Sequence, residues 1–396
     1  MINFFSASTR MGDSRNAIRE CMDAALGTNK ACDVVIVNAS VGHDYQALID
    51  EVRELAPGAR VLGSSCCGIV GSEGVSESMK DVAIMALRGK ELAVAHVDGI
   101  NGSNAYAKSV EMAMKLREAQ PGINMIYLLA SGIDIANDGC IAGLESVFGP
   151  EVTIFGATSS DNMRGVVSYQ MVDDQVFEHA AWVVGFADPT LQVDTQATHG
   201  FIAVGEPLTV TKAEGTRIFE LDGMPAWQQY TARLGLDAAT ATCGDTIPVG
   251  ALAERLPLEL AEEYGNSHIL RVVTKRESDG TMHYPTEIQN GSQLWLTARD
   301  ELRIFSDMDR MMRQMTARAG GRLPVAVFHA DCLARGRFLF NRVMKEELVS
   351  RMQYPLSRDG VPPPWLGMYG FGEFARLGGA NTYHNYTTAI YAIYRK

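Results

Sequence analysis

The feature that most constrains the fold of this chain is an internal repeat in its first half. One copy reads VIVNASVGHDYQALIDEV and then ARVLGSSCCGIVG; the other reads IYLLASGIDIANDGCIAGL and then VTIFGATSSDNMRG. Each copy has a strand ending in Ala-Ser, a Gly-containing turn with an acid (Asp44 or Asp134), a helix, and a second strand that ends in small residues. A hairpin-like pair of strands follows each copy, over residues 81–97 and 169–185. The repeat predicts that residues of about 33–190 fold as a pseudo-symmetric pair of half-domains.

The second half of the chain has its own alternation of strands and helices. Residues 217–223 read as a strand and turn, Pro225 suits a first helical turn, and residues 388–394 form an apolar strand. Methionines between residues 308 and 315 fall on one helix face, a stripe that is more typical of a core than of a cofactor site. We therefore predict an α/β protein of two packed α/β domains, residues 1–215, which contain the pseudo-repeat, and residues 216–396.

Charge and composition exclude several classes of protein. The 396 residues include 35 basic and 47 acidic ones, a net charge of −12, whereas a nucleic-acid binder needs a basic face. No apolar run approaches the ~20 residues that span a membrane, and the N-terminus has neither a basic nor a long apolar leader region. The seven cysteines form no CxxC pair, which is typical of a reducing compartment. We expect a cytoplasmic protein that binds neither nucleic acid nor membrane.

Loops of small residues end the second strand of each repeat copy, at residues 63–68 and 156–162. Such loops let a ligand approach backbone N–H groups closely, although tight turns beside packed helices have the same composition. The side chains that these loops would offer to a ligand are those of Ser64, Ser65, Cys66, Ser159, Asp161 and Asn162.

The densest cluster of reactive side chains lies near the C-terminus. It comprises His329, Asp331, Cys332, Arg335, Arg337, Tyr369, Glu373, His384 and Asn385. An Arg fork for a carboxylate and a Glu for an ammonium group suit a pocket for an amino acid or similar zwitterion. Cys332 as nucleophile, with His384 as base and Asn385 or Glu373 as orienting group, suits a hydrolase-like enzyme instead.

Histidine ligation is the third interpretation of this cluster. His329 and Cys332 are only a two-ligand fragment of a metal site, and a lone histidine is more often a hydrogen-bonded core residue. The phosphate-binding motif GxxxxGK[ST] is absent, and the stretch that begins at Gly370 lacks the third glycine of GxGxxG. The residues alone leave these three interpretations open.

Five stretches, in order along the chain, resemble the motifs of the FIST family, bacterial sensory modules built from FIST N and FIST C domains. They are residues 62–68 (G-C/S-S-T-x-G), 155–162 (G-G-S/A-A-x-D), 217–230 (R-x-x-E-x-D-G-x-P-A-x-x-x-Y), 332–336 (C-x-x-R-G) and 367–387 (G-F-Y-x-Y-G-E and F-H-N-x-T). The resemblance spans nearly the whole chain. Met368 and Gly370 depart from it, since the motif usually has an aromatic residue and often has Thr at these places.

The resemblance implies a sensor that binds a small molecule such as an amino acid and passes the signal on. Some stand-alone FIST proteins are haem proteins that sense nitric oxide and control a histidine kinase or a cyclic-di-GMP enzyme. A chain with no kinase, PAS or GGDEF segment resembles this subset, which implies haem b, a separate signalling partner and no catalytic activity. An amino-acid sensor without haem and a hydrolase-like enzyme stay as alternatives, and a homodimer stays open.

We expect the ligand site at the junction of the two domains, where pockets concentrate. The small-residue loops would form its floor, and the polar specificity would come from Cys332, Arg335, Tyr369, Glu373, His384 and Asn385. If the ligand is haem, His384 is the first candidate for the axial ligand and His329 the second. The alternative is that His384 and Asn385 tie the last strand to its neighbour.

Overall fold

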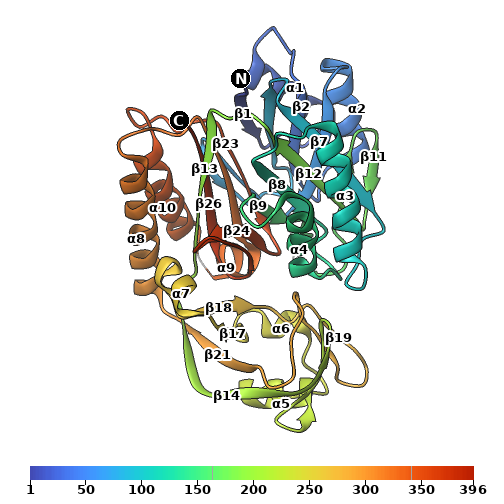
Figure 1. The fold of residues 1–396 in the computed structure, drawn as a ribbon, viewed down its shortest axis with the longest axis vertical. Helices are drawn as coiled ribbons and strands as arrows, with labels where there is room; N and C mark the ends of the chain where they lie inside the picture. The colour runs from blue at the N-terminus through green and yellow to red at the C-terminus, as the bar shows by residue number, and fades with distance from the viewer. Residues whose placement is uncertain (163, 340) are drawn as a thin grey trace.

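The chain folds into three similar β-α-β units around a shared core, with a smaller lobe at one end (Figure 1). This computed structural model describes residues 1–162, 164–339 and 341–396, and of residues 337–339 the backbone alone. In each unit two parallel strands, joined by helical segments, lie beside an antiparallel strand that also pairs with the first strand of the unit. The three units form the body of the molecule, which we call the prism.

The units follow one another along the chain, and their elements correspond in order. Unit 1 consists of β1 (Asn3–Thr9), α1 (Ser14–Leu26), β2 (Val34–Ser40), α2 (Tyr45–Leu55), β3 (Arg60–Cys66), β4 (Ile69–Gly71), β5 (Gly74–Ser76) and β6 (Val82–Arg88). Unit 2 consists of β7 (Leu92–Asp98), α3 (Ala105–Ala119), β8 (Met125–Ala130), α4 (Asn137–Phe148), β9 (Thr153–Thr158), β10 (Gln170–Val172), β11 (Gln175–Phe177) and β12 (Ala180–Phe186). Unit 3 consists of β13 (Leu191–Thr198), α8 (Glu301–Ala319), β22 (Ala326–Cys332), α9 (Leu333–Leu339), α10 (Arg342–Gln353), η1 (Tyr354–Leu356), β23 (Trp365–Gly370), β24 (Glu373–Leu377), β25 (Ala380–His384) and β26 (Thr388–Arg395).

Each unit lends a two-stranded hairpin to the sheet of another unit. The three sheets run β1-β6-β2-β3-β10-β11, β7-β12-β8-β9-β24-β25 and β13-β26-β22-β23-β4-β5. Unit 2 thus completes the sheet of unit 1, unit 3 completes that of unit 2, and unit 1 completes that of unit 3. This closed exchange ties the two ends of the chain into one body.

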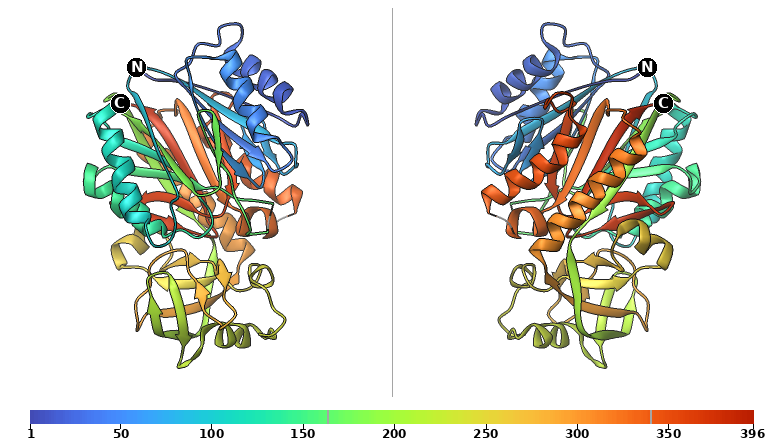
Figure 2. Two further views of the ribbon diagram at one scale, coloured as in Figure 1. Left: turned by 90° about the vertical axis from the view of Figure 1, so that its right-hand side faces the viewer. Right: turned by 90° about the vertical axis from the view of Figure 1, so that its left-hand side faces the viewer.

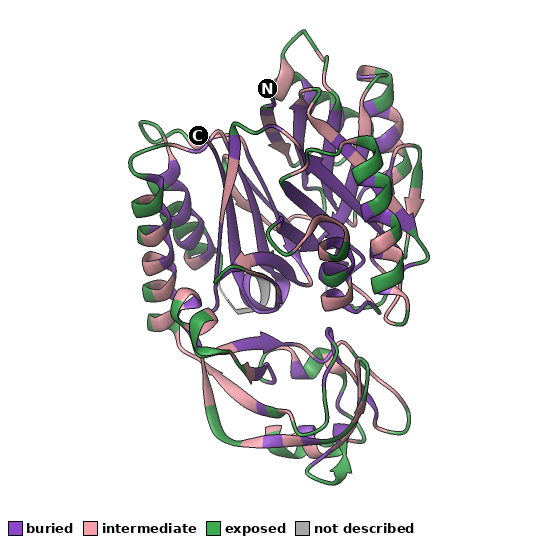
Figure 3. Cartoon of the chain, in the orientation of Figure 1, coloured by how far each residue is buried: buried purple, intermediate pink, exposed green. Residues whose placement is uncertain are grey.

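Each sheet is buried on both faces (Figure 3). Because successive side chains of a strand point to opposite faces, Ile36 faces the shared core whereas Val35 and Val37 pack under helices α1 and α2. Rings from all three sheets meet in the shared core, where the centroids of Tyr127 and Phe328 lie 4.7 Å apart. This double burial explains why the strands read as continuous apolar runs in the sequence.

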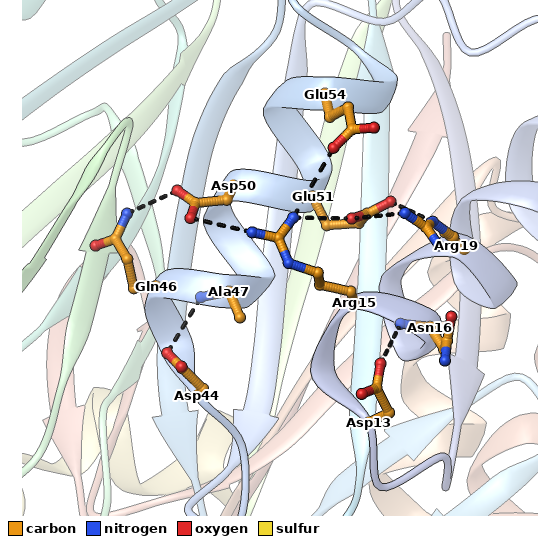
Figure 4. A network of polar contacts seen from close by, with 10 residues as sticks. All are labelled: Asp13, Arg15, Asn16, Arg19, Asp44, Gln46, Ala47, Asp50, Glu51 and Glu54. Carbon is orange, nitrogen blue, oxygen red and sulfur yellow. Dashed lines mark hydrogen bonds and ion pairs between the residues drawn. The ribbon is translucent and has the colours of Figure 1, made fainter.

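Polar contacts join the two outer helices of unit 1 (Figure 4). Asp13 caps α1 and Asp44 caps α2, each through a side-chain oxygen that accepts a backbone N–H three residues on. Arg15 and Arg19 of α1 both donate to the buried carboxylate of Glu51 in α2. The two helices therefore lie on the sheet as a linked pair.

The lobe is inserted in unit 3 between β13 and α8 and lies at the far end of the prism from the two termini (Figure 2). It consists of β14 (Phe201–Glu214), β15 (Arg217–Leu221), β16 (Met224–Pro225), α5 (Ala226–Leu234), α6 (Cys243–Thr246), β17 (Leu252–Arg255), α7 (Leu258–Tyr264), β18 (His268–Arg271), β19 (Lys275–Arg276), β20 (Met282–His283) and β21 (Gln293–Arg299). Its sheet runs β18-β17-β21-β14-β15-β20-β19, and Trp227 and Tyr230 of α5 pack into a core of its own.

The α/β class and the predicted repeat are confirmed. The β2-β3 and β8-β9 pairs share one register, in which Gly63 and Gly156 lie opposite Val37 and Leu128. Unit 3 is a third copy that sequence reasoning misses, because two helices, α9 and α10, separate its parallel strands. The hairpin expected over residues 81–97 is wrong: β6 and β7 lie in different sheets, because β7 starts the next unit.

The remaining expectations concern the second half of the chain. The methionine stripe of α8 is buried core, and Gly320 ends the helix in a left-handed conformation. The boundary at residues 215 and 216 falls in the turn between the paired strands β14 and β15, and the division there stays a prediction. Among the helices of the described residues, none has the length and apolar character needed to cross a membrane.

Candidate functional site

A cavity lies where the lobe meets units 2 and 3 of the prism. Its volume is about 100 Å³, and its walls are mostly apolar, with Ile133, Ile135, Val272 and Phe371 among them. Polar side chains from both bodies interrupt these walls; they are Asp134, Asn137, Arg164, Thr216, Cys243, Thr274, His283, Tyr284 and Tyr383. We call this space the junction cavity.

A second hollow, of about 280 Å³, adjoins the junction cavity, and the two share Asp134, Thr216 and His283. His283 Nε2 lies 2.7 Å from Oε1 of Glu277, whose Oε2 lies 3.1 Å from a guanidinium nitrogen of Arg217. Side chains of both charges therefore stand at the adjoining hollow.

Close backbone packing shapes the wall that unit 2 contributes. A Cβ atom at Gly132 would lie 1.9 Å from the Ser159 carbonyl oxygen, so only glycine allows the backbones at residues 132 and 159 to pack this closely. The Asp161 carboxylate accepts N–H bonds of 2.8 to 3.1 Å from the backbone of residues 164–166. Asp161 therefore holds the turn that brings Arg164 to the cavity, although its own side chain is not part of the wall.

The first turn of α4 also borders the junction cavity. Its N-cap, Ala136, offers no side-chain acceptor, whereas Asp44 caps the equivalent helix of unit 1. The backbone N–H and the Nδ2 of Asn137 both donate to the Pro285 carbonyl of the lobe, at 3.1 and 3.0 Å. Oδ1 of Asn137 has no hydrogen-bond partner among the described residues, although the residue is only 2% exposed.

The small-residue loops singled out in the sequence lie where the three units meet. Ser65 Oγ donates to the Ser160 carbonyl at 2.8 Å, and Ser160 Oγ donates to the Tyr369 carbonyl at 2.7 Å. The Cys67 N–H donates to the same Tyr369 carbonyl at 3.1 Å. Ser64, Cys66 and Ser159 are buried near these contacts, and half-buried Asn162 lies 3.8 Å from the sulfur of Met79. Donors of these loops thus pair with neighbouring units.

The C-terminal cluster is divided between two sheets. On the outer face of the unit 3 sheet, under the helices, the Arg335 guanidinium donates to Asp331 at 3.0 Å. Cys332 ends β22 of the same sheet and packs against residues of the lobe. Glu373 begins β24, which completes the sheet of unit 2, and its carboxyl accepts a 2.6 Å bond from the Thr387 hydroxyl. Burial raises the pKa of the Glu373 carboxyl well above its usual range. Groups that form one cluster in the sequence are therefore distributed over strands of two sheets.

His384 and Asn385 bond to nearby segments of unit 3. His384 Nε2 lies 2.7 Å from the Thr382 hydroxyl, and Asn385 Nδ2 donates to the Phe371 carbonyl at 2.8 Å. Burial lowers the pKa of His384 well below its usual value, so the ring is neutral. These contacts agree with the structural alternative for this pair.

A haem does not fit the described residues at either candidate histidine. The cavity beside His384 is about 10 Å³, whereas a cavity of about 150 Å³ holds benzene, which is much smaller than haem. His329 Nε2 lies 2.9 Å from the Thr388 hydroxyl, and the ring packs edge-on against Trp365 at 6.0 Å. Within the described part of the chain, no three His, Cys, Asp or Glu side chains gather as a metal site.

The side chains predicted for the site stand behind the junction cavity rather than in its wall. Of the described residues that line it, none belongs to the predicted set, but Leu333 follows Cys332 and Tyr383 precedes His384 along the chain. The side chain of Arg337 lies outside the described residues.

Cys332 and His384 do not form a nucleophile–base pair in the described structure. The Cys332 sulfur lies 3.8 Å from the Phe371 carbonyl oxygen, and His384 Nε2 lies beside the Thr382 hydroxyl instead. Burial raises the pKa of the Cys332 thiol well above its ordinary value, which is opposite to what activates a nucleophile.

Two family models together match most of the chain. The FIST N domain matches residues 33–224 and the FIST C domain matches residues 226–376. The chain belongs to the FIST family. FIST domains are sensory modules of signal transduction that bind small ligands.

Among proteins similar to this FIST protein are two uncharacterized ones, and the chain spans about half of their length or less. MJ1623 of Methanocaldococcus jannaschii is 28% identical over a stretch that covers 42% of this chain and 34% of its own length. Mb0898c of Mycobacterium bovis is 25% identical over a stretch that covers 52% of this chain and 52% of its own length. A crystal structure of cyanuric acid hydrolase from A. caulinodans aligns over 100% of this chain and 99% of its own, at 7% identity and a TM-score of 0.38.

Sequence reasoning missed the residues that wall the cavity of this FIST protein. Asn137 and Asp134 lie in the repeat, in the turn after Ser131, and that turn was the one available signal. His283 and Val272 belong to the lobe and match no motif, so only the folded chain brings them to unit 2.

Proposed function

We propose that this FIST protein is a non-catalytic sensor whose ligand occupies the junction cavity. The observation that carries this proposal is that the lobe and the prism each supply part of the wall. A ligand that fills such a space stabilises one position of the lobe relative to the prism, which is how binding becomes a signal.

The cavity suits a small amphipathic molecule of about the size of an amino acid. Its volume of about 100 Å³ is somewhat below that of a cavity that holds benzene, so a larger ligand would extend into the adjoining hollow. Apolar walls would take an aliphatic group, while Arg164 and Asp134, both exposed at the wall, would pair with a carboxylate and an ammonium group. The size of the cavity disfavours haem as the ligand.

Contacts across the junction supply the means of transmission. The Arg271 guanidinium of the lobe donates to the Tyr383 carbonyl at 2.7 Å, and the Tyr386 hydroxyl donates to the Ile247 carbonyl at 2.8 Å. Since Tyr383 and Ile247 also line the cavity, a ligand would touch the groups that hold the lobe. A separate protein, such as a histidine kinase or a cyclic-di-GMP enzyme, would read the position of the lobe.

Filling the cavity tests this function. We would titrate the twenty amino acids into the purified chain by calorimetry and screen them by thermal shift. At least one should bind, and Val272→Phe, which places a larger side chain in the wall, should weaken binding at least tenfold. Val204→Phe, at a lobe position that is 40% exposed and away from the cavity wall, is the matched control and should bind normally.

The same samples separate a sensor from an enzyme. A sensor returns the bound molecule unchanged, whereas a hydrolase-like enzyme would convert it, which mass spectrometry of the incubated mixture detects. Binding that survives Val272→Phe unaltered would place the ligand elsewhere and overturn the proposed site.

A further inference from the structure

The buried amide of Asn137 has one polar atom that the protein does not satisfy. The residue is 2% exposed and lines the junction cavity, and its Oδ1 accepts no hydrogen bond from the described residues. A buried acceptor without a partner costs about 1–3 kcal/mol, so such atoms are rare in folded proteins. Because Asn137 borders the junction cavity, a molecule bound there can supply the missing donor.

The orientation of this amide is fixed by the lobe. Nδ2 of Asn137 donates to the Pro285 carbonyl at 3.0 Å, and the backbone N–H of the same residue donates to that carbonyl at 3.1 Å. A carbonyl oxygen can only accept, so a flipped amide would set Oδ1 against another acceptor. Oδ1 is therefore the atom left without a partner, and because it is an acceptor it can pair only with a hydrogen-bond donor.

The surroundings of Asn137 narrow the kind of donor. Ile133 and Ile135 stand on the same loop, and Leu333 and Phe371 line the cavity from unit 3, so a ligand here would meet apolar side chains as well as the Asn137 acceptor. An N–H group of the ligand meets the acceptor directly, whereas an ester or a carboxylate oxygen would face it as a second acceptor.

We propose that Asn137 is a specificity-determining residue that selects ligands carrying an N–H donor, either the ammonium group of an amino acid or the N–H of an amide. This inference rests on the proposed function, because it assigns a role within the same cavity. It adds that a ligand lacking the N–H group is rejected, since its binding would leave Oδ1 buried and unpaired.

Matched pairs of small molecules test this selection. The probes are L-valine against 3-methylbutanoate, which lacks only the ammonium group, and isobutyramide against methyl isobutyrate, each titrated by calorimetry. We expect the N–H member of at least one pair to bind at least tenfold more tightly than its counterpart. Preference in the first pair identifies an ammonium donor and preference in the second an amide donor.

Variants assign the selection to Asn137. Asn137→Leu should remove the difference within the pair, because the acceptor is gone. Asp138→Ala is the control: Asp138 Oδ2 accepts the Glu287 N–H at 2.9 Å across the same junction, but the residue does not line the cavity. Asp138→Ala removes this hydrogen bond to the lobe but leaves the Asn137 acceptor in place, so the variant should keep the preference for the N–H member of the pair. Asn137→Asp, which retains an acceptor at this position, replaces the leucine variant if that variant misfolds, and it should keep the preference for the N–H member of the pair.

The outcomes separate the inference from the function on which it rests. Equal binding of both members of each pair to the wild-type chain overturns the role of Asn137 but leaves the cavity as a ligand site, provided that Val272→Phe abolishes that binding. Loss of preference in Asp138→Ala to the same extent as in Asn137→Leu also overturns it, since Asn137 would then act only as a tie to the lobe. If none of the four probes binds and no amino acid binds either, both proposals fail.

Discussion

Burial governs the reactivity of individual cysteines in this protein. Burial raises the pKa of the thiol in Cys32, Cys243 and Cys332, but Cys332 is 2% exposed whereas Cys32 and Cys243 are half-buried. We expect iodoacetamide at pH 7 to modify Cys32 and Cys243 first, and Cys332 about a hundredfold more slowly, because the thiolate is the reacting form and the site must open. Peptide mass spectrometry over time measures these rates. Rapid alkylation of Cys332 that a small molecule blocks would favour the hydrolase-like enzyme.

Gly200 is the residue on which the crossing from prism to lobe depends. Its φ of +77° is a left-handed conformation, and a Cβ atom would lie 2.4 Å from the Cα atom of Ile304 in α8. We expect Gly200→Ala to lower the free energy of unfolding by about 2 kcal/mol or more, from backbone strain and the clash together. Gly205→Ala shares the strain, at φ +70°, but meets nothing within 4 Å, so it should lose about 1 kcal/mol. Urea unfolding measures the free energy of unfolding of both variants. Equal decreases would mean that α8 shifts to make room for the new methyl group at residue 200.

At the scale of elements, equivalent hairpins place Gln170 and Glu373 in the same position. Each is the first residue of a hairpin added to another sheet, opposite Ser64 and Ala157, which are themselves equivalent. Oε1 of Gln170 accepts the Ala180 N–H at 2.8 Å, and the Glu373 carboxyl accepts from the corresponding residue, Thr387. An amide and a neutral carboxyl are therefore interchangeable here.

This equivalence predicts the pH dependence of Glu373→Gln. Burial raises the pKa of Glu373 in the folded state, so between the unfolded value of about 4.3 and the folded value the folded chain holds more protons. The stability of the wild type therefore falls as pH rises through this window, and the Gln variant escapes this loss. We expect Glu373→Gln to be at least as stable as the wild type at pH 8. Between pH 8 and pH 5, the free energy of unfolding of the variant should rise less than that of the wild type, as measured by urea unfolding. Gln170→Glu should acquire the same pH dependence and be less stable at pH 8 than at pH 5. A Gln170→Glu variant without this loss at pH 8 would contradict the equivalence.

At the scale of the whole molecule, three buried histidines set the response to acid. Burial lowers the pKa of His199 and of His329 to about 3, and that of His384 well below its usual value. Below pH 6.5 the unfolded chain binds protons that the folded chain does not, so stability falls as pH drops, by up to about 1.4 kcal/mol per pH unit for each histidine. We expect His329→Gln, which can still bond to Thr388, to reduce this slope between pH 6.5 and pH 4 in urea unfolding. An unchanged slope would mean that His329 does not stay neutral when folded.

The exchange of hairpins also makes the prism one cooperative body. Strand β26, near the C-terminus, pairs with β13 over residues 191–198 and lies in the middle of its sheet, and the hairpin β24–β25 completes the sheet of unit 2. We expect residues 1–215 expressed alone to remain unfolded, because one sheet would lack its centre. Circular dichroism and amide hydrogen exchange test this, and a folded fragment would support the division at residues 215 and 216.

Part of the candidate site was within reach of the sequence, and part was not. The turn after Ser131, which the repeat marks with Asp134, borders the junction cavity, whereas the loops expected to form its floor do not line it. The small residues of 63–68 instead make room for neighbouring backbone, since the ends of β3, β9 and β23 converge. A small residue leaves space for a ligand or for another loop, and composition does not distinguish the two.

The sequence by itself determined the local units of this protein: the apolar strands, the capped helices, the repeat and the FIST motifs. These depend on side chains a few residues apart, so the periodic pattern contains them. Only the tertiary structure decided that a third unit exists, that hairpins are exchanged, that Asp331 and Glu373 lie in different sheets, and that the lobe closes a cavity against unit 2. Those facts depend on contacts between residues far apart in the chain, which no local pattern encodes.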